Sequence, residues 1–378
     1  MADLTMKFIF ICFFWFSFSS CKCYAFDFAK VPKDITEEYS EQINISGADK
    51  LKDSLPEYSL DLLNRANINS LNSTDQINLE RVMIIVTDIL KNKIKKPIKC
   101  ILPIISILIF FALVSSLQSY KNMDIDGILK SIISCLVSSF LIFSILKTIK
   151  TAVLAITFAS NFIFCFLPIF LTSVVASGIP LSASIFNSTI VYCNQIIMNL
   201  SKNIVPIANS MASMCIVASI SSKVNFKRLF DILYSIIKWI LIFASFLISL
   251  IFSLQRLVTS SVETAITKEI KFAVGLVPII GSAIGDAAST VTTSARILST
   301  NVGVFGILSL FFIFLPSILE CCVWMASLQF CEFFSQMFEL KNLVILFSSL
   351  RKTISVVFAI IVICLLIFIF TTSAVIKM

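Results

Sequence analysis

Long apolar runs alternate with short polar segments through most of this chain. A helix needs about 20 apolar residues to cross a bilayer. Runs of that length lie near Ile98–Leu117, Ile128–Leu146, Ala152–Ser177, Ile232–Leu254, Val302–Cys322 and Ile354–Ile376. The pattern therefore predicts an all-α polytopic integral membrane protein.

Two further segments are ambiguous. Amides and Lys202 interrupt the apolar residues between Leu181 and Ser221, where Pro206 begins a second apolar piece. This region predicts either two weak spans or a hairpin that enters the bilayer and returns. Lys271–Asn301 is also doubtful, so we expect about 6–9 membrane helices or re-entrant elements in all.

Residues 1–25 have the three parts of a secretory signal peptide. Lys7 precedes the apolar run Phe8–Phe18, and small residues lead to a cleavage position after Ala25. The apolar run is too short to span a bilayer. An alternative interpretation makes Cys21 the lipidated residue of an imperfect lipoprotein box.

Residues 26–99 form a polar segment with twelve of the 22 acidic residues. Ser73 and Gln76 fit a capping box, and the apolar spacing that follows predicts an amphipathic helix to about Lys91. The segment is either a docking surface for a partner or a small cap on the chain's own membrane domain. The chain thus divides into a signal peptide (1–25), a polar extracytoplasmic helical segment (26–99) and a multi-span membrane domain (100–378).

The orientation signals disagree. A signal peptide places residues 26–99 outside the cytoplasm, yet Lys91, Lys93, Lys95, Lys96 and Lys99 crowd the start of the first span. Such a cluster is typical of a cytoplasmic flank. We favour the signal peptide and expect these lysines to bind anionic headgroups at the outer face.

The composition argues against most kinds of catalytic and metal-binding site. The chain is 58% hydrophobic with a mean hydropathy of +0.97, and it contains no histidine. It therefore lacks the commonest general base and transition-metal ligand. No P-loop, metal-ligand cluster or catalytic triad can be assembled, so we expect no enzyme activity, no cofactor and no metal. The net charge of +8 is spread between apolar runs and does not predict nucleic-acid binding.

Charged residues near spans are expected at the membrane surface. Glu320 and Glu332 flank an apolar helix that contains Trp324. We expect both carboxylates at the level of the headgroups or beyond, because ionised groups are unfavourable in hydrocarbon.

A small-residue stripe is the main candidate site. Small side chains recur at every fourth position: Gly281, Gly285, Ser289 and Thr293. On a helix they form one flat face that another backbone can approach. Asp286 lies beside this face, Pro278 precedes it, and Arg296 follows as a candidate counter-charge.

Two hypotheses for this segment stay open. It is either a re-entrant or broken helix lining a water-filled path, with Asp286 facing the path, or a tight packing interface in which Asp286 caps a helix end. Pro168 and Pro206 also begin small-residue segments, which hints at the internal repeats of secondary transporters.

Four motifs point to a known family. They are Thr264–Phe272, Val277–Gly281, Gly285–Ala288 and Asn301–Gly306. Together with the signal peptide and the polar acidic segment, they resemble the stage III sporulation protein AE family of endospore-forming bacteria. The family's small-residue motif falls on Gly281, Gly285, Asp286 and Ser289 of this sequence.

The resemblance implies a function and partners. Members of this family are multi-pass proteins of the mother-cell membrane around the forespore. They work with other stage III sporulation A proteins, which include a cytoplasmic ATPase and ring-forming proteins, and these join a forespore membrane protein to make a channel-like link required for late forespore development. The alternative function is a self-sufficient secondary transporter for a small solute.

Overall fold

The computed structural model describes residues 48–66, 68, 79–118, 126–178, 180–220, 226–275 and 280–376. Within them the chain forms a short 3-10 helix and seven α-helices, and no strand. The elements are η2 (Ala48–Ser54), α3 (Glu57–Arg65), α4 (Leu79–Gln118), α5 (Asp126–Ala176), α6 (Pro180–Ile220), α7 (Phe226–Gly275), α8 (Ile280–Met337) and α9 (Lys341–Ile376). The prediction of an all-α fold is confirmed.

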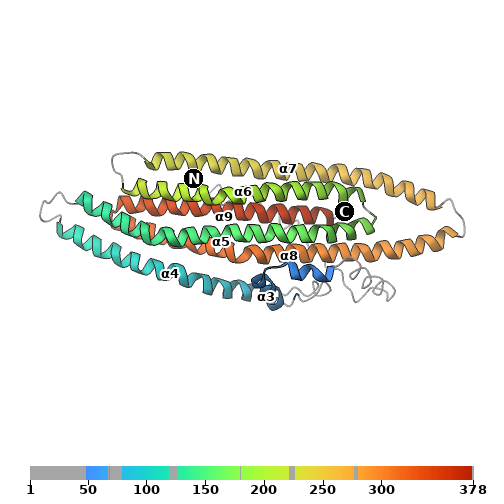
Figure 1. The fold of residues 1–378 in the computed structure, drawn as a ribbon, viewed down its shortest axis with the longest axis horizontal. Coiled ribbons are helices and arrows are strands. Elements are labelled where there is room, and N and C mark those ends of the chain that lie inside the picture. Colours follow the sequence, from blue (N-terminus) through green and yellow to red (C-terminus); the bar gives the residue numbers. More distant parts are fainter. Residues whose placement is uncertain are drawn as a thin grey trace.

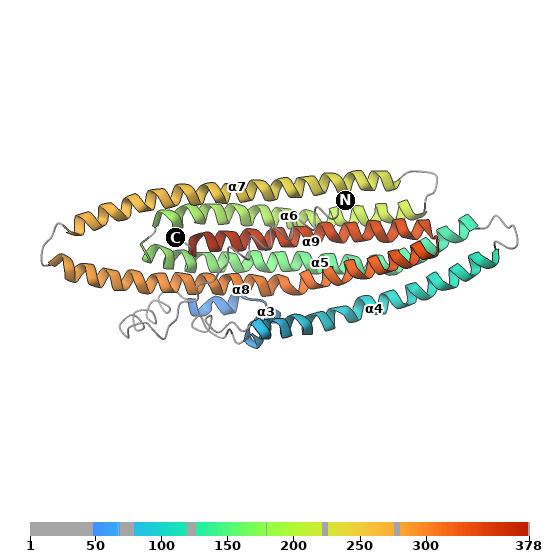
Figure 2. The ribbon, with the colours of Figure 1, turned by 180° about the vertical axis from the view of Figure 1, so that it is seen from behind.

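The six long helices α4–α9 lie side by side in one elongated bundle (Figures 1 and 2). Helix α8 packs against α9, α5 and α4, and α6 packs against α5, α9 and α7. Helices α4 and α7 lie at opposite edges, while η2 and α3 cover part of α8 and α5 (Figure 1). The chain is therefore organised around α5, α8 and α9.

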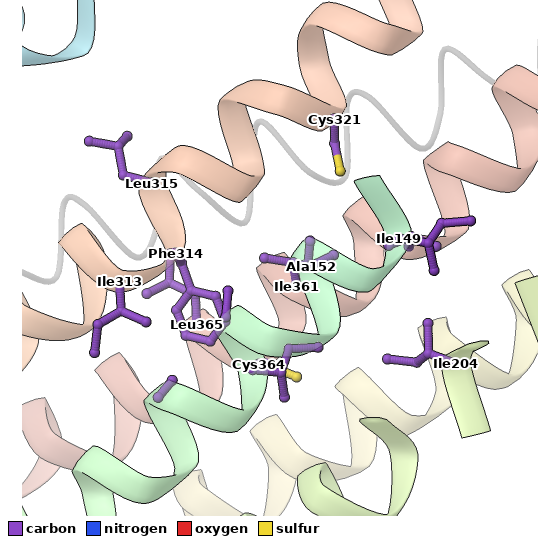
Figure 3. Packing of buried hydrophobic residues seen from close by; sticks show 14 of the residues in the cluster. Ile149, Ala152, Ile204, Ile313, Phe314, Leu315, Cys321, Ile361, Cys364 and Leu365 are labelled. Atoms are coloured by element: carbon purple, nitrogen blue, oxygen red, sulfur yellow. The ribbon is translucent and has the colours of Figure 1, made fainter. Parts of the chain in front are cut away.

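Aliphatic and aromatic side chains fill the space between these helices. Figure 3 shows part of the core, which includes Ala152 of α5, Phe314 of α8 and Leu365 of α9. Buried residues recur at helical spacing, so each helix turns one continuous stripe inward. Where the helices face lipid, close van der Waals packing of these side chains stabilises the bundle, because lipid tails are as apolar as the side chains themselves.

Two predicted spans are one helix. The apolar runs Ile128–Leu146 and Ala152–Ser177 predict two spans with a boundary between them, but α5 runs through Lys147 and Lys150 without a break. Lysine has good helix propensity, and this stretch contains neither glycine nor proline to end a helix. Among the described residues, five helices are long and apolar enough to cross a membrane: α4, α5, α7, α8 and α9.

Two other boundaries were also wrong. The amphipathic helix expected to end near Lys91 continues as α4 to Gln118. The ambiguous region is occupied as far as Ile220 by a single helix, α6, with Pro206 inside it. Proline does not break these helices, because neighbouring groups in a packed bundle can satisfy the backbone that it frees.

The polar N-terminal segment packs on the chain's own helices. The Tyr58 hydroxyl of α3 donates a 3.1 Å hydrogen bond to the Ile313 carbonyl of α8, three residues before Pro316. The Tyr58 ring also meets Phe158 of α5 edge to face, with 6.2 Å between ring centroids. Burial raises the pKa of Tyr58 to about 12, so the phenol keeps the proton that it donates. For these residues the structure favours the cap over a free docking surface.

Replacing Tyr58 with Phe should loosen this cap. Loss of one hydrogen bond weakens the docking of α3 by about 1 kcal/mol. We therefore expect trypsin to cleave faster after the exposed Arg65 in Tyr58→Phe than in the parent protein. Tyr192→Phe, at an exposed tyrosine of α6, is the matched control. Equal cleavage rates in all three proteins would show that the hydrogen bond does not hold α3.

Gly306 should be required for the contact between α5 and α8. A Cβ at this position lies 2.5 Å from Cε2 of Phe166, whose ring is stacked between Phe162 and Phe170 with centroids 5.8 and 5.1 Å away. The ring has little room to move, so Gly306→Ala should destabilise the bundle by about 1–3 kcal/mol through overpacking.

The partner residue provides the control for this prediction. Phe166→Leu leaves a gap that the added methyl group of Gly306→Ala can occupy, so the double variant should lose less stability than the sum of the two single variants. Thermal unfolding in mild detergent measures all four proteins. Strictly additive losses would contradict the contact.

Candidate functional site

The structure places the predicted stripe at one end of α8. Pro278 lies outside the described residues. The backbone of α8 is continuous through Gly281, Gly285, Asp286 and Ser289, although the side chains in this stretch are not among those described. Thr293 and Arg296 follow on α8 and are exposed. From Ile280 onward the helix has no break within the stripe. The pairing of Asp286 with Arg296 stays a prediction.

This end of α8 projects from the bundle. In Figures 1 and 2 the first part of α8 and the last part of α7 extend beyond the ends of α5 and α6. The stripe is thus far along α8 from the charged side chains that the structure brings together.

A charged contact inside the bundle joins three helices. Glu320 of α8 is 7% exposed and accepts a hydrogen bond from Lys93 Nζ of α4, with which it forms an ion pair. Its other carboxylate oxygen accepts a 3.0 Å hydrogen bond from Thr148 Oγ1 of α5. The Glu320 side chain is enclosed by helices and paired within the protein, and its level relative to the headgroups stays a prediction. Thr148 and Lys93 satisfy the carboxylate there.

Lys93, Thr148 and Glu320 lie at one level along the length of the bundle. From this level α4 continues to Gln118 and α5 runs back to Asp126, while α5 continues the other way to Ala176. The two arms of α5 are about 33 and 42 Å long at 1.5 Å per residue. A hydrocarbon layer is about 30 Å thick, so it covers one arm but not both.

The apolar surface therefore forms two layers separated by charge. The first layer contains residues 100–118 of α4 and 131–146 of α5, and the second contains residues 152–176 of α5 and 297–319 of α8; none of these stretches has a charged residue. Lys147 and Lys150 lie between the layers on α5. Apolar runs that look like equivalent spans in the sequence thus lie at different levels along the bundle.

Two more ion pairs hold α9. Arg351 Nε lies 3.2 Å from Glu332 Oε2 of α8, and Lys352 Nζ lies 2.6 Å from Asp231 Oδ1 of α7. The Lys352 ammonium also stands 5.6 Å from the centroid of the Tyr234 ring, at cation–π distance. Adjacent cations on α9 therefore connect it to helices on two sides.

Uncharged polar contacts join α6 to its neighbours. Ser160 of α5 donates to Asn194 Oδ1, and Asn194 Nδ2 donates to the Ser160 carbonyl over 3.3 Å, with both residues fully buried. Cys215 Sγ lies 3.8 Å from Thr353 Oγ1 of α9. Among the described residues no three His, Cys, Asp or Glu side chains are grouped to hold a metal ion. These contacts orient helices and fix their registers.

The sequence carries only a partial signal for these contacts. Glu320 is the one acidic residue between Asp286 and Glu332, and the lysine cluster before the first span supplies many possible partners. Charge complementarity between the two segments can be seen in the sequence, but the choice of Lys93 depends on how α4 crosses α8.

Removal of either charge should destabilise the bundle more than removal of both. Glu320→Leu leaves Lys93 without its partner, and Lys93→Met leaves a buried carboxylate unpaired, which costs about 3 kcal/mol. The double variant Lys93→Met/Glu320→Leu should recover most of this loss. Titration with denaturing detergent in mixed micelles measures the free energy of unfolding.

An exposed ion pair gives the control. Asp61 and Arg65 of α3 are 2.9 Å apart and largely exposed, so Asp61→Asn should change stability by less than about 0.5 kcal/mol. A double variant that loses as much as the sum of its single variants would show that Lys93 and Glu320 are not coupled.

Comparison with known proteins identifies the family. The family model described as stage III sporulation protein AE matches residues 65–378, which include α4–α9 in full. No curated protein and no solved structure matches the chain. Because the match covers most of the chain, this protein belongs to the stage III sporulation protein AE family.

Proposed function

We propose that this protein is a membrane subunit of the stage III A transenvelope complex, a channel-like or secretion-like assembly that links mother cell and forespore and is required for late forespore development. The match to the sporulation family over residues 65–378 is the observation that carries this proposal. The proposed location is the mother-cell membrane around the forespore.

The shape of the bundle supports a role in an assembly. Its longest helices have 50 to 58 residues, which corresponds to about 75–87 Å. This length is more than twice the thickness of the hydrocarbon layer, which is about 30 Å. Part of the bundle therefore stands outside the hydrocarbon layer, where other proteins can contact it. The α7–α8 end and the exposed face of α3 are two such parts.

The proposed partners are the other stage III sporulation A proteins. They include a cytoplasmic ATPase, ring-forming proteins and, indirectly, a forespore membrane protein. The sequence has no P-loop or other nucleotide fingerprint, so we assign the supply of energy to the ATPase.

The structure gives little support to a self-sufficient transporter. Secondary transporters commonly build their substrate sites from discontinuous helices near the middle of the membrane. Pro168 and Pro206, whose small-residue segments hint at the internal repeats of transporters, lie inside the continuous helices α5 and α6. We therefore prefer the channel subunit.

Co-purification tests the proposed function. An epitope-tagged copy is isolated in mild detergent from sporulating cells, and the proteins bound to it are identified by mass spectrometry. We expect the sporulation ATPase and the ring-forming proteins, and neither with an unrelated tagged membrane protein. Recovery of the chain alone, under conditions that keep a control membrane complex intact, would contradict the proposal.

Asp286→Asn separates the two functions in the same experiment. A transporter that uses this carboxylate should lose solute flux and still assemble. A packing subunit should instead lose its partners or show little change.

A further inference from the structure

The exposed side of α6 is mainly polar, although Val191, Tyr192 and Val217 are exposed in the same sector. Ten exposed residues on this side carry hydroxyl, amide or ammonium groups: Ser184, Asn187, Ser188, Gln195, Asn199, Lys202, Asn203, Asn209, Ser210 and Ser213. Their spacings of three, four and seven residues place them on one face of the helix. We call this face the α6 polar stripe. Lys202 is the only charged residue between Pro180 and Ile220.

Apolar surfaces lie beside the stripe. Helix α6 packs against α5 and α7, and both present large exposed apolar side chains. On α7 these include Trp239, Phe243 and Phe246, and on α5 they include Phe164. The α6 polar stripe is therefore a narrow polar surface on a bundle whose neighbouring surfaces suit lipid.

Lipid is a poor environment for this stripe. Ser188, Ser210 and Ser213 donate to carbonyls of their own helix, but among the described residues the side-chain amides of Asn187, Gln195 and Asn209 have no hydrogen-bond partner. An amide transferred to hydrocarbon without a partner costs several kcal/mol. The stripe therefore faces water or another polar surface.

We propose that copies of this chain surround a water-filled path and that the α6 polar stripe lines it. This inference rests on the proposed channel function. A path through the middle of a single chain is excluded for the described residues, because fully buried side chains such as Phe162, Phe305 and Phe347 fill the bundle. The path then runs between chains.

Self-complementarity favours copies of the same chain around the path. Amides and hydroxyls carry both donors and acceptors, so identical stripes can face one another, directly or through water, without the repulsion that a charged face would suffer. Tyr192, Ile196 and Ile207 are exposed at the margin of the stripe and offer apolar contacts to the next copy. A closed ring repeats one such contact. Lys202 then forms a ring of positive charge, which favours anions.

Cysteine labelling in liposomes tests the lining. Ser188→Cys and Ser210→Cys change one atom in the stripe, while Ser139→Cys and Ser235→Cys are matched changes at exposed serines among the apolar residues of α5 and α7. All four are made after replacement of the exposed Cys135 and Cys165 by Ser. A membrane-impermeant methanethiosulfonate should label the stripe about tenfold faster than the controls, because a thiolate forms in water and is suppressed in an apolar environment.

The charge of the reagent tests the lysine ring. At Ser210→Cys an anionic methanethiosulfonate should react about twofold faster than a cationic one, since Lys202 lies about one Debye length away. Lys202→Gln should remove this difference. Equal labelling of stripe and control positions would overturn the lining.

Cross-linking tests the occupant. A bismaleimide should join two copies at Ser188→Cys and fail to do so at Ser139→Cys. Rapid labelling without a cross-link between copies would overturn the ring, because the stripe of the purified protein would then face bulk water. Both experiments use purified protein in liposomes, so they can fail while the co-purification succeeds, and the reverse also holds.

Discussion

The register of the bundle depends on one buried ionised group. Glu320 stands on α8, the helix that contacts α4, α5 and α9, and its carboxylate needs donors because water does not reach it. Lys93 and Thr148 supply them from two other helices. Sliding α4 or α5 by one turn would move these donors about 5 Å and leave the carboxylate unpaired. A packed apolar interface alone tolerates such slips far better.

Charge at this level also separates two apolar layers. The face of the second layer near Ile313 is covered by α3, which turns the exposed pair Asp61–Arg65 outward. Exposed ion pairs are incompatible with hydrocarbon, so this face lies outside it. Among the described residues nothing comparable covers the first layer, and Phe110 of α4 and Phe143 of α5 are strongly exposed there. The first layer is therefore the better candidate for contact with lipid on this side of the bundle.

Hydropathy predicted which residues are helical and apolar but not where helices end. Lys147 and Lys150 look like the boundary between two spans, yet a lysine can continue a helix and extend its ammonium group away from the core. The depth of each apolar run depends on contacts between helices, and the pairing of Glu320 with a residue 227 positions away is not encoded locally. The small-residue stripe could be recognised in the sequence because its spacing is local. Its role stays a prediction, because a role depends on contacts that local spacing does not specify.

Helix α6 shows why its sequence is ambiguous. The side chain of Asn194 points inward and is satisfied by Ser160, while the α6 polar stripe faces outward. Averaged along the chain, polar residues on both sides of α6 lower its hydropathy to that of a weak span. The polar residues on the two sides have different physical roles. The inner amide specifies how α6 packs on α5, whereas the outer amides require a polar environment that the described part of the chain does not provide. A helix of this kind is complete only when something polar covers it, which makes α6 the element through which the bundle is expected to form an assembly.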